Sequence, residues 1–450
     1  MNTVKVDFLD TVGAMKPMNA ANNGPKHPSV KNRGNFEEYK ELRIPYARTH
    51  DSAECLAHGA PNIVDIWRVF PDFDADPTLP ESYDFFLTDR YLQTIIDAGT
   101  KVFYRLGQTI EHAAKKYYIH PPKDYKKWAV ICEHVIRHYN EGWANGFHYD
   151  IEYWEIWNEP DLMQDNNSPT WTGTKEQFFD FYEVASKYLK EKFPHLKIGG
   201  PAAVGARQYM VEFVNEMKKR NVHLDFFSWH EYNCKVENVL DRVAFVRNML
   251  DEAGYENTES ILNEWAYIKG WDKSFVYSLE NIAGIKGASY VAGVMSSCQY
   301  APLDMLMYYD LNPSALFNGV FDHLSQRKLK TYDSLYWFAN LVDLGNAVKV
   351  STCEDIYCAA ATDGKHHGML LTHYNNDDAT EPKRITLSWN GMQGKCKVTV
   401  YRTDADKNAE PITEMVLNGA ESVEWNYTLK VFDVCYVDIQ PIDRNEEKVL

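Results

Sequence analysis

The sequence predicts an α/β fold, a (β/α)8 TIM barrel with an accessory antiparallel β-sandwich domain. From about residue 35 to residue 344, apolar strands alternate with amphipathic helices, which is typical of a parallel sheet. These strands lack a clean apolar/polar alternation, so both faces of the sheet are expected to be buried. After about residue 345 the chain changes to short alternating strands separated by turn residues, which favours a sandwich.

The elements of the expected barrel follow one another in a regular order. Amphipathic helices are expected at 35–42, 83–98, 124–143, 174–193, 205–220, 238–253, 273–286 and 331–344. Apolar strands are expected at 44–48, 101–106, 153–159, 196–200, 224–229, 260–264 and 289–299. Thr174 and Gln177 form a capping-box signal, which supports the start of one helix at this point.

The second part of the chain is expected to form the sandwich. Its short strands are predicted at 356–361, 369–373, 384–389, 396–401 and 431–439. Turn residues separate these strands, for example Thr362-Asp363-Gly364. We therefore divide the chain into a barrel at 10–344 and a C-terminal β-sandwich at 345–442.

The composition of the 450-residue chain narrows the classes of protein to consider. Its formal net charge of −17 and pI of about 5.4 disfavour contact with phosphate backbones, so we expect no nucleic-acid partner. No apolar run reaches about 18 residues, so we expect no membrane span. The first residues lack a hydrophobic signal core; the protein is expected to be cytoplasmic, or periplasmic or secreted if a signal peptide was removed.

The eight cysteines are scattered without a CxxC pair, and free thiols are the simplest interpretation.

Two glutamates stand out because each ends a strand. Glu159 ends the run that begins at Tyr153 and is followed by Pro160, and Glu264 ends the run that begins at Ser260. They are 105 residues apart, which equals three strand–helix units of about 35 residues. That spacing places them on strands four and seven, facing each other across one rim of the barrel. Paired carboxylates there indicate cleavage of a glycosidic bond, whereas the alternative for each is a helix cap or a surface salt bridge.

Four segments give the chain a family likeness. They are Tyr46-Ala47-Arg48-Thr49-His50, Trp154 to Asp161, Asp225 to Tyr232, and Asn263-Glu264-Trp265. With these segments the chain resembles family 39 of the clan A glycoside hydrolases, whose members include β-xylosidases and α-L-iduronidases. The resemblance spans roughly residues 10–345. It implies a retaining, two-step hydrolysis without a cofactor, and a sandwich to which an N-terminal strand, here within residues 1–9, contributes.

The resemblance also implies roles for the paired carboxylates. Glu159 would be the general acid/base and Glu264 the nucleophile, with carboxyl groups about 5–5.5 Å apart. Arg48 would favour the ionised form of Glu264 by its charge, and Tyr232 would do so by a hydrogen bond. The charge of Glu264 is expected to raise the pKa of Glu159 and so keep it protonated.

Further substrate contacts follow from the same likeness. Asn158 would reach the sugar 2-hydroxyl, and His50 and His230 would bind hydroxyls around the ring. Each histidine could instead be structural. Arg48 could also be a buried partner of a barrel carboxylate, and this role can coexist with a role in the site.

One departure from the family concerns the floor beneath the cleaved sugar. The family commonly has a tryptophan there, on strand eight. In this chain the corresponding segment runs from Ser297 to Asp304, and Tyr300 is the aromatic residue nearest that place. We therefore expect Tyr300 in the substrate site and leave the identity of the sugar open.

The prediction for function is a retaining exo-glycoside hydrolase, β-xylosidase-like, acting on oligosaccharides or other glycosides. Alternatives on the same scaffold are a β-galactosidase or α-L-arabinopyranosidase type, a uronide-active glycosidase, and a catalytically silent sugar-binding barrel. The content of aromatic residues, 14%, fits a sugar cleft, because aromatic faces serve as stacking platforms for sugars. The sequence does not predict an oligomeric state.

We expect neither a cofactor nor a metal. The spacing Asp72-x-Asp74-x-Asp76 resembles the start of a calcium loop, but Pro77 and Tyr83 stand where glycine and glutamate are needed. A metal-dependent barrel hydrolase that uses the two histidines of the proposed site is a further alternative.

Overall fold

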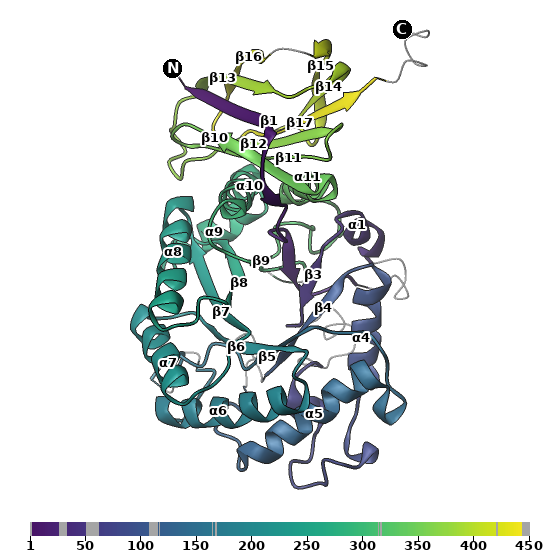
Figure 1. Ribbon diagram of the computed structural model, residues 1–450, viewed down its shortest axis with the longest axis vertical. Helices are drawn as coiled ribbons and strands as arrows, with labels where there is room; N and C mark the ends of the chain where they lie inside the picture. Colours follow the sequence, from purple (N-terminus) through teal and green to yellow (C-terminus); the bar gives the residue numbers. More distant parts are fainter. Residues whose placement is uncertain are drawn as a thin grey trace.

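The computed structural model describes residues 2–26, 34–50, 63–107, 116, 118–163, 165–166, 169–313, 315, 317–419 and 422–442. Within these ranges, parallel strands close into a barrel, and a separate sheet lies beyond one side of it (Figure 1). The predicted fold class, a (β/α)8 barrel with an accessory β-sandwich, is confirmed.

Eight strands form the barrel, and their order around it is their order in the sequence. They are β2 (Ala20–Asn22), β3 (Tyr46–Arg48), β4 (Lys101–Leu106), β5 (Tyr153–Ile156), β6 (Lys197–Ala203), β7 (Phe226–Asn233), β8 (Glu259–Tyr267) and β9 (Met305–Tyr308). β2 pairs in parallel with both β3 and β9, which closes the barrel. β5 and β8 are therefore the fourth and seventh strands, as the spacing of the two glutamates predicts.

Helices surround the barrel and connect its strands (Figure 1). They are α1 (Phe36–Glu41), α3 (Ile66–Val69), α4 (Phe86–Asp97), α5 (Tyr125–Glu141), α6 (Lys175–Lys192), α7 (Arg207–Lys219), α8 (Val236–Glu252), α9 (Phe275–Ile282), α10 (Ile285–Gln299) and α11 (Lys330–Leu344), with short 3-10 turns at Pro80–Ser82 and Trp143–Asn145. The predicted capping box is present at α6. The Thr174 hydroxyl accepts from the Gln177 backbone N–H, and the Thr174 N–H donates to the Gln177 side chain.

The segment 289–299 corrects the sequence prediction, because it belongs to a helix and not to a strand. It forms most of α10, whose residues are buried almost throughout. Apolar runs without a polar face occur both in buried strands and in fully buried helices, so periodicity alone does not separate the two. α10 is buried all round because it packs between the barrel and the second sheet. The eighth barrel strand is instead β9, six residues after α10 ends.

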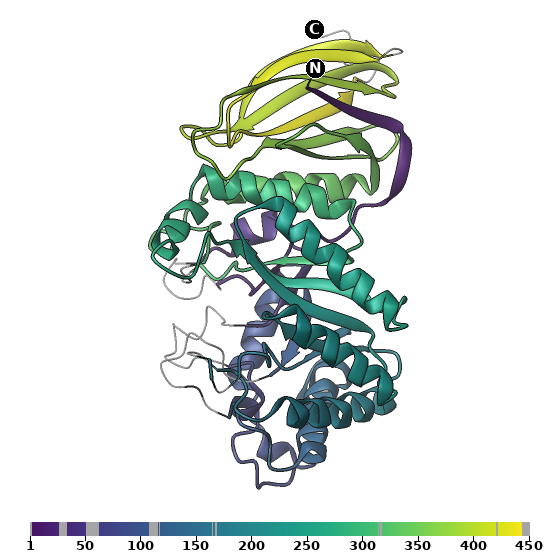
Figure 2. The same cartoon turned by 90° about the vertical axis from the view of Figure 1, so that its left-hand side faces the viewer.

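The second sheet contains strands from both ends of the chain. Its strands are β1 (Thr3–Ala14), β10 (Asn346–Ser351), β11 (Ile356–Thr362), β12 (His367–His373), β13 (Lys383–Asn390), β14 (Gly394–Thr403), β15 (Glu410–Gly419), β16 (Val423–Leu429) and β17 (Val434–Pro441). The order across the sheet is β15-β14-β17-β12-β11-β10-β1-β13-β16. Pairing is antiparallel except between β1 and β13, which run parallel. The sheet folds over into two layers around its own apolar core (Figure 2).

The sequence missed three strands of this sheet, β10, β15 and β16. β15 and β16 are the two edges of the sheet, and no residue of β15 is fully buried. An edge strand needs few apolar residues, and polar side chains protect it from pairing with other chains. The apolar signal that identifies a central strand is therefore weak in both.

A buried lysine joins the second sheet to the barrel. Lys286, at the start of α10, is only 3% exposed. Its ammonium group lies 2.7 Å from both the Asn376 carbonyl and an Asp378 carboxylate oxygen, in the connection between β12 and β13. Tyr277 of α9 donates to the same carboxylate at 2.8 Å. The sandwich is thus fastened to α9 and α10, next to the end of β8.

The described part of the chain contains most of the cysteines and all of the helices named above. Seven cysteines there are free thiols, and Cys55 lies outside the described residues. Cys353 and Cys358, although close in sequence, are both unpaired. None of the described helices has the length and apolarity needed to cross a bilayer.

Candidate active site

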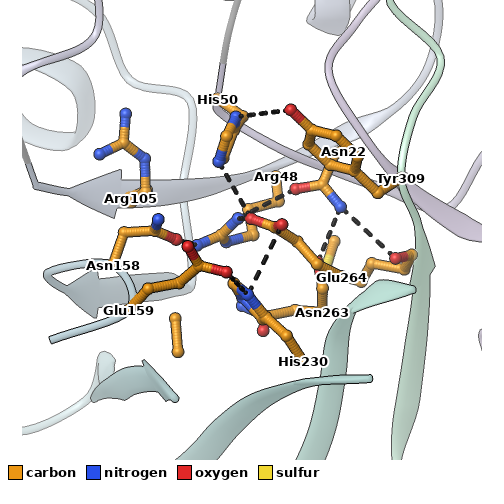
Figure 3. Close-up of polar contacts among 12 residues, drawn as sticks. Asn22, Arg48, His50, Arg105, Asn158, Glu159, His230, Asn263, Glu264 and Tyr309 are labelled. Atoms are coloured by element: carbon orange, nitrogen blue, oxygen red, sulfur yellow. Dashed lines mark hydrogen bonds and ion pairs between the residues drawn. The ribbon is translucent and has the colours of Figure 1, made fainter. Parts of the chain in front are cut away.

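Glu159 lies three residues after β5, and Glu264 lies in the C-terminal half of β8. Both are almost completely buried, with Glu159 4% and Glu264 1% exposed. Side chains from several barrel strands converge on them (Figure 3). In (β/α)8 barrels the carboxyl end of the strands carries the active site.

The backbone around Glu159 is held in an uncommon conformation. Trp157 and Glu159 have positive φ values of 75° and 50°, which non-glycine residues seldom adopt. The Glu159 N–H donates to the Ala202 carbonyl at 3.0 Å, and the Thr170 hydroxyl donates to the Glu159 carbonyl. These bonds turn the chain sharply after β5 and fix the direction of the Glu159 side chain.

A β-bulge precedes the second carboxylate. Leu262 pairs with Trp229, but Glu264 pairs with His230, so β8 contains one extra residue, Asn263, at this point. A bulge re-aims the side chains of the strand that contains it. Here the strand continues with Glu264 beside His230, at the rim of the barrel.

Arg48 is the centre of the polar network around Glu264. It is fully buried, and its guanidinium group donates to Glu155 at 2.6 Å and to Glu264 at 2.7 Å. It also donates to the side-chain oxygens of Asn158 at 2.7 Å and Asn22 at 3.0 Å. A planar guanidinium can satisfy several acceptors at once in this way, and it holds four side chains in fixed positions.

Glu264 has three further polar neighbours. The Tyr232 hydroxyl donates to one of its oxygens at 2.7 Å. His50 Nε2 lies 3.0 Å from the other oxygen, and His230 Nδ1 lies 3.5 Å from the first. The carboxylate is therefore oriented on both of its oxygens.

The two glutamates lie close to each other and share one imidazole. His230 Nδ1 is 2.8 Å from a Glu159 oxygen, while also facing Glu264. One oxygen of each carboxylate and a ring nitrogen of His230 all lie within 4.8 Å of one another. Two carboxylates this close can act on the two atoms of one bond in a bound substrate.

The site sets different charge states for its groups. Burial lowers the pKa of His230 to about 3, so this imidazole is neutral near neutral pH. Burial alone raises the pKa of Glu264, but its interactions with His230, His50 and the Arg48 guanidinium outweigh burial and hold that pKa well below its usual range. Since the guanidinium remains charged at any ordinary pH, Arg48 is the lasting source of this effect.

The structure brings together seven of the eight residues that the sequence singled out. The group comprises Arg48, His50, Asn158, Glu159, His230, Tyr232 and Glu264. The side-chain Nδ2 of Asn158 is buried and has no hydrogen-bond partner within the described part of the chain. It is therefore available to a ligand that fills the space beside Glu159.

Tyr300 is the exception, and its prediction is corrected. It caps the C-terminus of α10, and its hydroxyl donates to the Val348 carbonyl at 3.0 Å and accepts from the Ala360 N–H at 3.3 Å. Both partners belong to the second sheet, so Tyr300 lies away from the two glutamates. The error follows from the misread segment 289–299: a helix that precedes a barrel strand ends at the opposite rim from the active site.

The aromatic residue that follows the true eighth strand is Tyr309. Its hydroxyl lies 3.5 Å from His50 Nδ1, and the two rings meet edge to face at 5.1 Å (Figure 3). The predicted strand at 289–299 leaves Tyr309 out, because it places the eighth strand too early in the sequence. Correct placement of β9 at Met305–Tyr308 would have identified it.

Other buried polar residues of the site were also missed; they are Asn22, Arg105, Glu155 and Asn263. Glu155 and Arg105 had a usable signal, because a charge within a buried strand must find a partner. Glu155 pairs with Arg48, and Arg105 pairs with Asp65 at 2.7 Å. Asn22 ends the three-residue strand β2, which is too short to be recognised by its pattern.

Glu159, His230 and Glu264 also form a group whose atoms are close enough to hold a cation. The donor set fits a divalent metal poorly, because the guanidinium of Arg48 already contacts Glu264 at 2.7 Å. A second positive charge would be placed beside the first in a buried site. The same positions suit a sugar, whose hydroxyl groups can exchange hydrogen bonds with carboxylates and imidazoles.

A closed barrel with a buried carboxylate pair carried by its fourth and seventh strands is the arrangement expected of a glycoside hydrolase. The chain belongs to glycosyl hydrolases family 39, whose model matches residues 4–308. The predicted family is thereby confirmed.

Individual relatives resemble this chain over different lengths. A β-xylosidase from Geobacillus stearothermophilus is 28% identical over 179 residues, which is 37% of this chain and 34% of that protein. The match thus spans about a third of the curated relative. Among solved structures, a glucosidase from Croceicoccus marinus has a TM-score of 0.81 at 20% identity, covering 98% of this chain and 100% of that one. A β-xylosidase from Caulobacter crescentus has a TM-score of 0.72 at 15% identity, with coverage of 98% and 100%.

Proposed function

We propose that this protein is a retaining exo-glycoside hydrolase with β-xylosidase-like specificity, in which Glu264 is the nucleophile and Glu159 the general acid/base. The observation that carries the proposal is the approach of the two carboxylates, whose nearest oxygens lie within 4.8 Å. Retaining enzymes hold their carboxyl groups about 5–5.5 Å apart, whereas inverting enzymes leave about 6.5–9.5 Å for a water molecule.

The network around Glu264 supports its role as nucleophile. Its lowered pKa keeps the carboxylate ionised, and contacts to both oxygens fix the direction of attack. In the first step a Glu264 oxygen bonds to the anomeric carbon while the bond to the leaving oxygen breaks. Glu159 gives its proton to that oxygen.

The second step reverses these roles. Water attacks the anomeric carbon, its proton passes to Glu159, and the bond to Glu264 breaks with the electron pair returning to the carboxylate. His230 adds no positive charge beside the proposed acid, because it is neutral near neutral pH. The sugar leaves with the anomeric configuration it had in the substrate.

The remaining site residues would bind the sugar. The free Nδ2 of Asn158 is placed to donate to a hydroxyl next to the anomeric centre, and His50 and His230 line the same space. The β-xylosidases from Geobacillus stearothermophilus and Caulobacter crescentus favour a xyloside as the substrate. The glucosidase from Croceicoccus marinus makes other neutral sugars the next candidates. The barrel at residues 10–344 would carry the activity, and the sandwich at 345–442 would not contribute a catalytic residue.

A panel of nitrophenyl glycosides tests both the class of reaction and the sugar. The panel contains β-xyloside, β-galactoside, α-L-arabinopyranoside and β-glucuronide. We expect turnover of the β-xyloside, and release of the sugar first as its β-anomer in an NMR time course. First release of the α-anomer would exclude retention. Full activity in EDTA would exclude the metal-dependent alternative.

Variants of the two glutamates test their roles. Glu264→Ala is expected to lose at least about 10⁴-fold in kcat and, with added azide, to yield the α-glycosyl azide from a β-xyloside. Glu159→Ala with azide should yield the β-glycosyl azide instead. Glu256→Ala, at an exposed position after α8, is the matched control and should behave as the native protein. A folded Glu264→Ala protein with native activity would exclude the assignment.

A further inference from the structure

Trp271 is an exposed aromatic residue at the rim of the barrel, in the connection between β8 and α9. It is 63% exposed, which is unusual for so large an apolar side chain. It follows Glu264, which lies within β8, by seven residues. Its position therefore places it on the side of the barrel that carries the proposed nucleophile.

Three other rings hold the indole in place. Phe275 stacks against it with ring centres 5.5 Å apart and planes inclined by 22°. Tyr232 meets it edge to face at 5.4 Å and 80°, and Phe317 packs beside it at 6.2 Å. We call Tyr232, Trp271, Phe275 and Phe317 the rim cluster. Because Phe275 covers one face of the indole and the side chain remains largely exposed, the opposite face is open.

The rim cluster is continuous with the catalytic site. The ring of Tyr232 touches Trp271, and the hydroxyl at the other end of that ring donates to Glu264 at 2.7 Å. The width of one tyrosine thus separates the open indole face from the proposed nucleophile. Tyr309 and Phe317 also contact each other, at 5.5 Å, and connect the cluster to His50.

An exposed side chain can be an incidental feature of a surface, and Val276 provides the comparison. It is also 63% exposed and lies only five residues further along, in α9. Trp271 differs from it because three aromatic rings fix the indole. Pre-arranged aromatic faces bind the apolar faces of sugar rings and of aromatic groups with little loss of conformational entropy.

We propose that Trp271 is the platform of a leaving-group subsite, on which the first sugar ring of the leaving group or an aromatic aglycone stacks. This inference rests on the proposed exo-acting function: the cleaved sugar is then terminal, so any further ring belongs to the leaving group. Trp271 would select substrates whose leaving group carries a flat, apolar face, such as oligosaccharides and aryl glycosides.

Three donors of the same sugar test the subsite. In xylobiose and nitrophenyl β-xyloside the leaving group is a ring, whereas in β-xylosyl fluoride it is a single atom that cannot reach the platform. Trp271→Ala is expected to lower kcat/KM about tenfold for the two ring-bearing donors, mainly through KM, and to change the fluoride by less than about twofold. If the glycoside panel selects another sugar, the three donors carry that sugar.

Two further variants complete the test. Trp271→Phe keeps a ring at the rim and should recover most of the lost kcat/KM for xylobiose. Val276→Ala should leave all three donors unchanged. Equal losses for the ring-bearing donors and the fluoride, or no loss for any of them, would overturn the subsite. A native protein that hydrolyses no glycoside would instead overturn the proposed function, so the two failures are distinguishable.

Discussion

Arg48 in the barrel and Lys286 at the joint with the sandwich are both buried cations, but they are buried in different ways. All four side chains that accept from Arg48 are themselves almost completely buried. Lys286 reaches a backbone carbonyl and Asp378, whose side chain is 61% exposed. The first charge is enclosed with its partners, whereas the second reaches a partner that water also contacts.

The difference shows that the buried charges around Arg48 are not hydrated, whereas the charge of Asp378 is. Arg48 carries one positive charge and contacts two carboxylates, Glu155 and Glu264, so negative charge is in excess in the buried network. Such an excess favours the positive charge that develops on the sugar ring during glycoside cleavage. The single charges of Lys286 and Asp378 cancel, so this ion pair has only a structural role between the barrel and the sandwich.

Among the variants that test this contrast, the largest effect is expected for Arg48→Met. The substitution leaves two carboxylates buried without their cation, which costs about 3–5 kcal/mol in the free energy of unfolding. We also expect kcat to fall by about 10²–10³-fold, because Glu264 loses its orientation and the cause of its lowered pKa. Denaturant unfolding and kinetics on the preferred nitrophenyl glycoside measure the two effects. Native kcat in a folded variant would contradict the interpretation of Arg48.

Lys286→Met is expected to act on stability alone. It keeps the apolar stem but removes the bonds to Asn376 and Asp378, at a cost of about 1–3 kcal/mol. Because the exposed carboxylate of Asp378 can be hydrated, the loss in the free energy of unfolding should be smaller than for Arg48→Met. The value of kcat should change by less than about threefold. The same unfolding and kinetic assays decide this. If kcat falls as steeply as in Arg48→Met, the contrast between the two cations fails.

The smallest change in structure among the three variants is Tyr232→Phe. It removes one hydrogen bond to Glu264 and keeps the ring that supports Trp271. A bond to the charged carboxylate lowers its pKa, so its removal raises the pKa of Glu264 and moves the acidic limb of the pH profile of kcat/KM to higher pH. At the optimum we expect a loss of about tenfold in kcat. An unchanged acidic limb would show that the Tyr232 hydroxyl does not help to keep Glu264 ionised.

Much of the fold and the centre of the site could be predicted from the sequence. Glu159 and Glu264 each end an apolar strand, and their spacing is a multiple of the barrel repeat, so local pattern and overall topology agree. The capping box at Thr174 was equally readable, because both of its residues lie within one turn.

The remainder depends on packing that the sequence does not display. The segment 289–299 is apolar on all sides because α10 lies between the barrel and the sandwich, and that position is known only from the fold. A strand predicted at this place puts Tyr300 in the site and leaves Tyr309 out. Asn22 and Asn263 are drawn into the network by a three-residue strand and by a bulge, and neither has a pattern of its own.

The place of β1 has a consequence for dissecting the molecule. This strand, made from the first residues of the chain, lies between β10 and β13 and pairs with both. A recombinant fragment that begins near residue 345 would lack β1. In that fragment β10 and β13 would have no strand between them, and each would expose unpaired backbone groups along one edge. Such edges invite self-association. A soluble sandwich would therefore require the amino-terminal peptide to be supplied, either grafted by a linker or added separately.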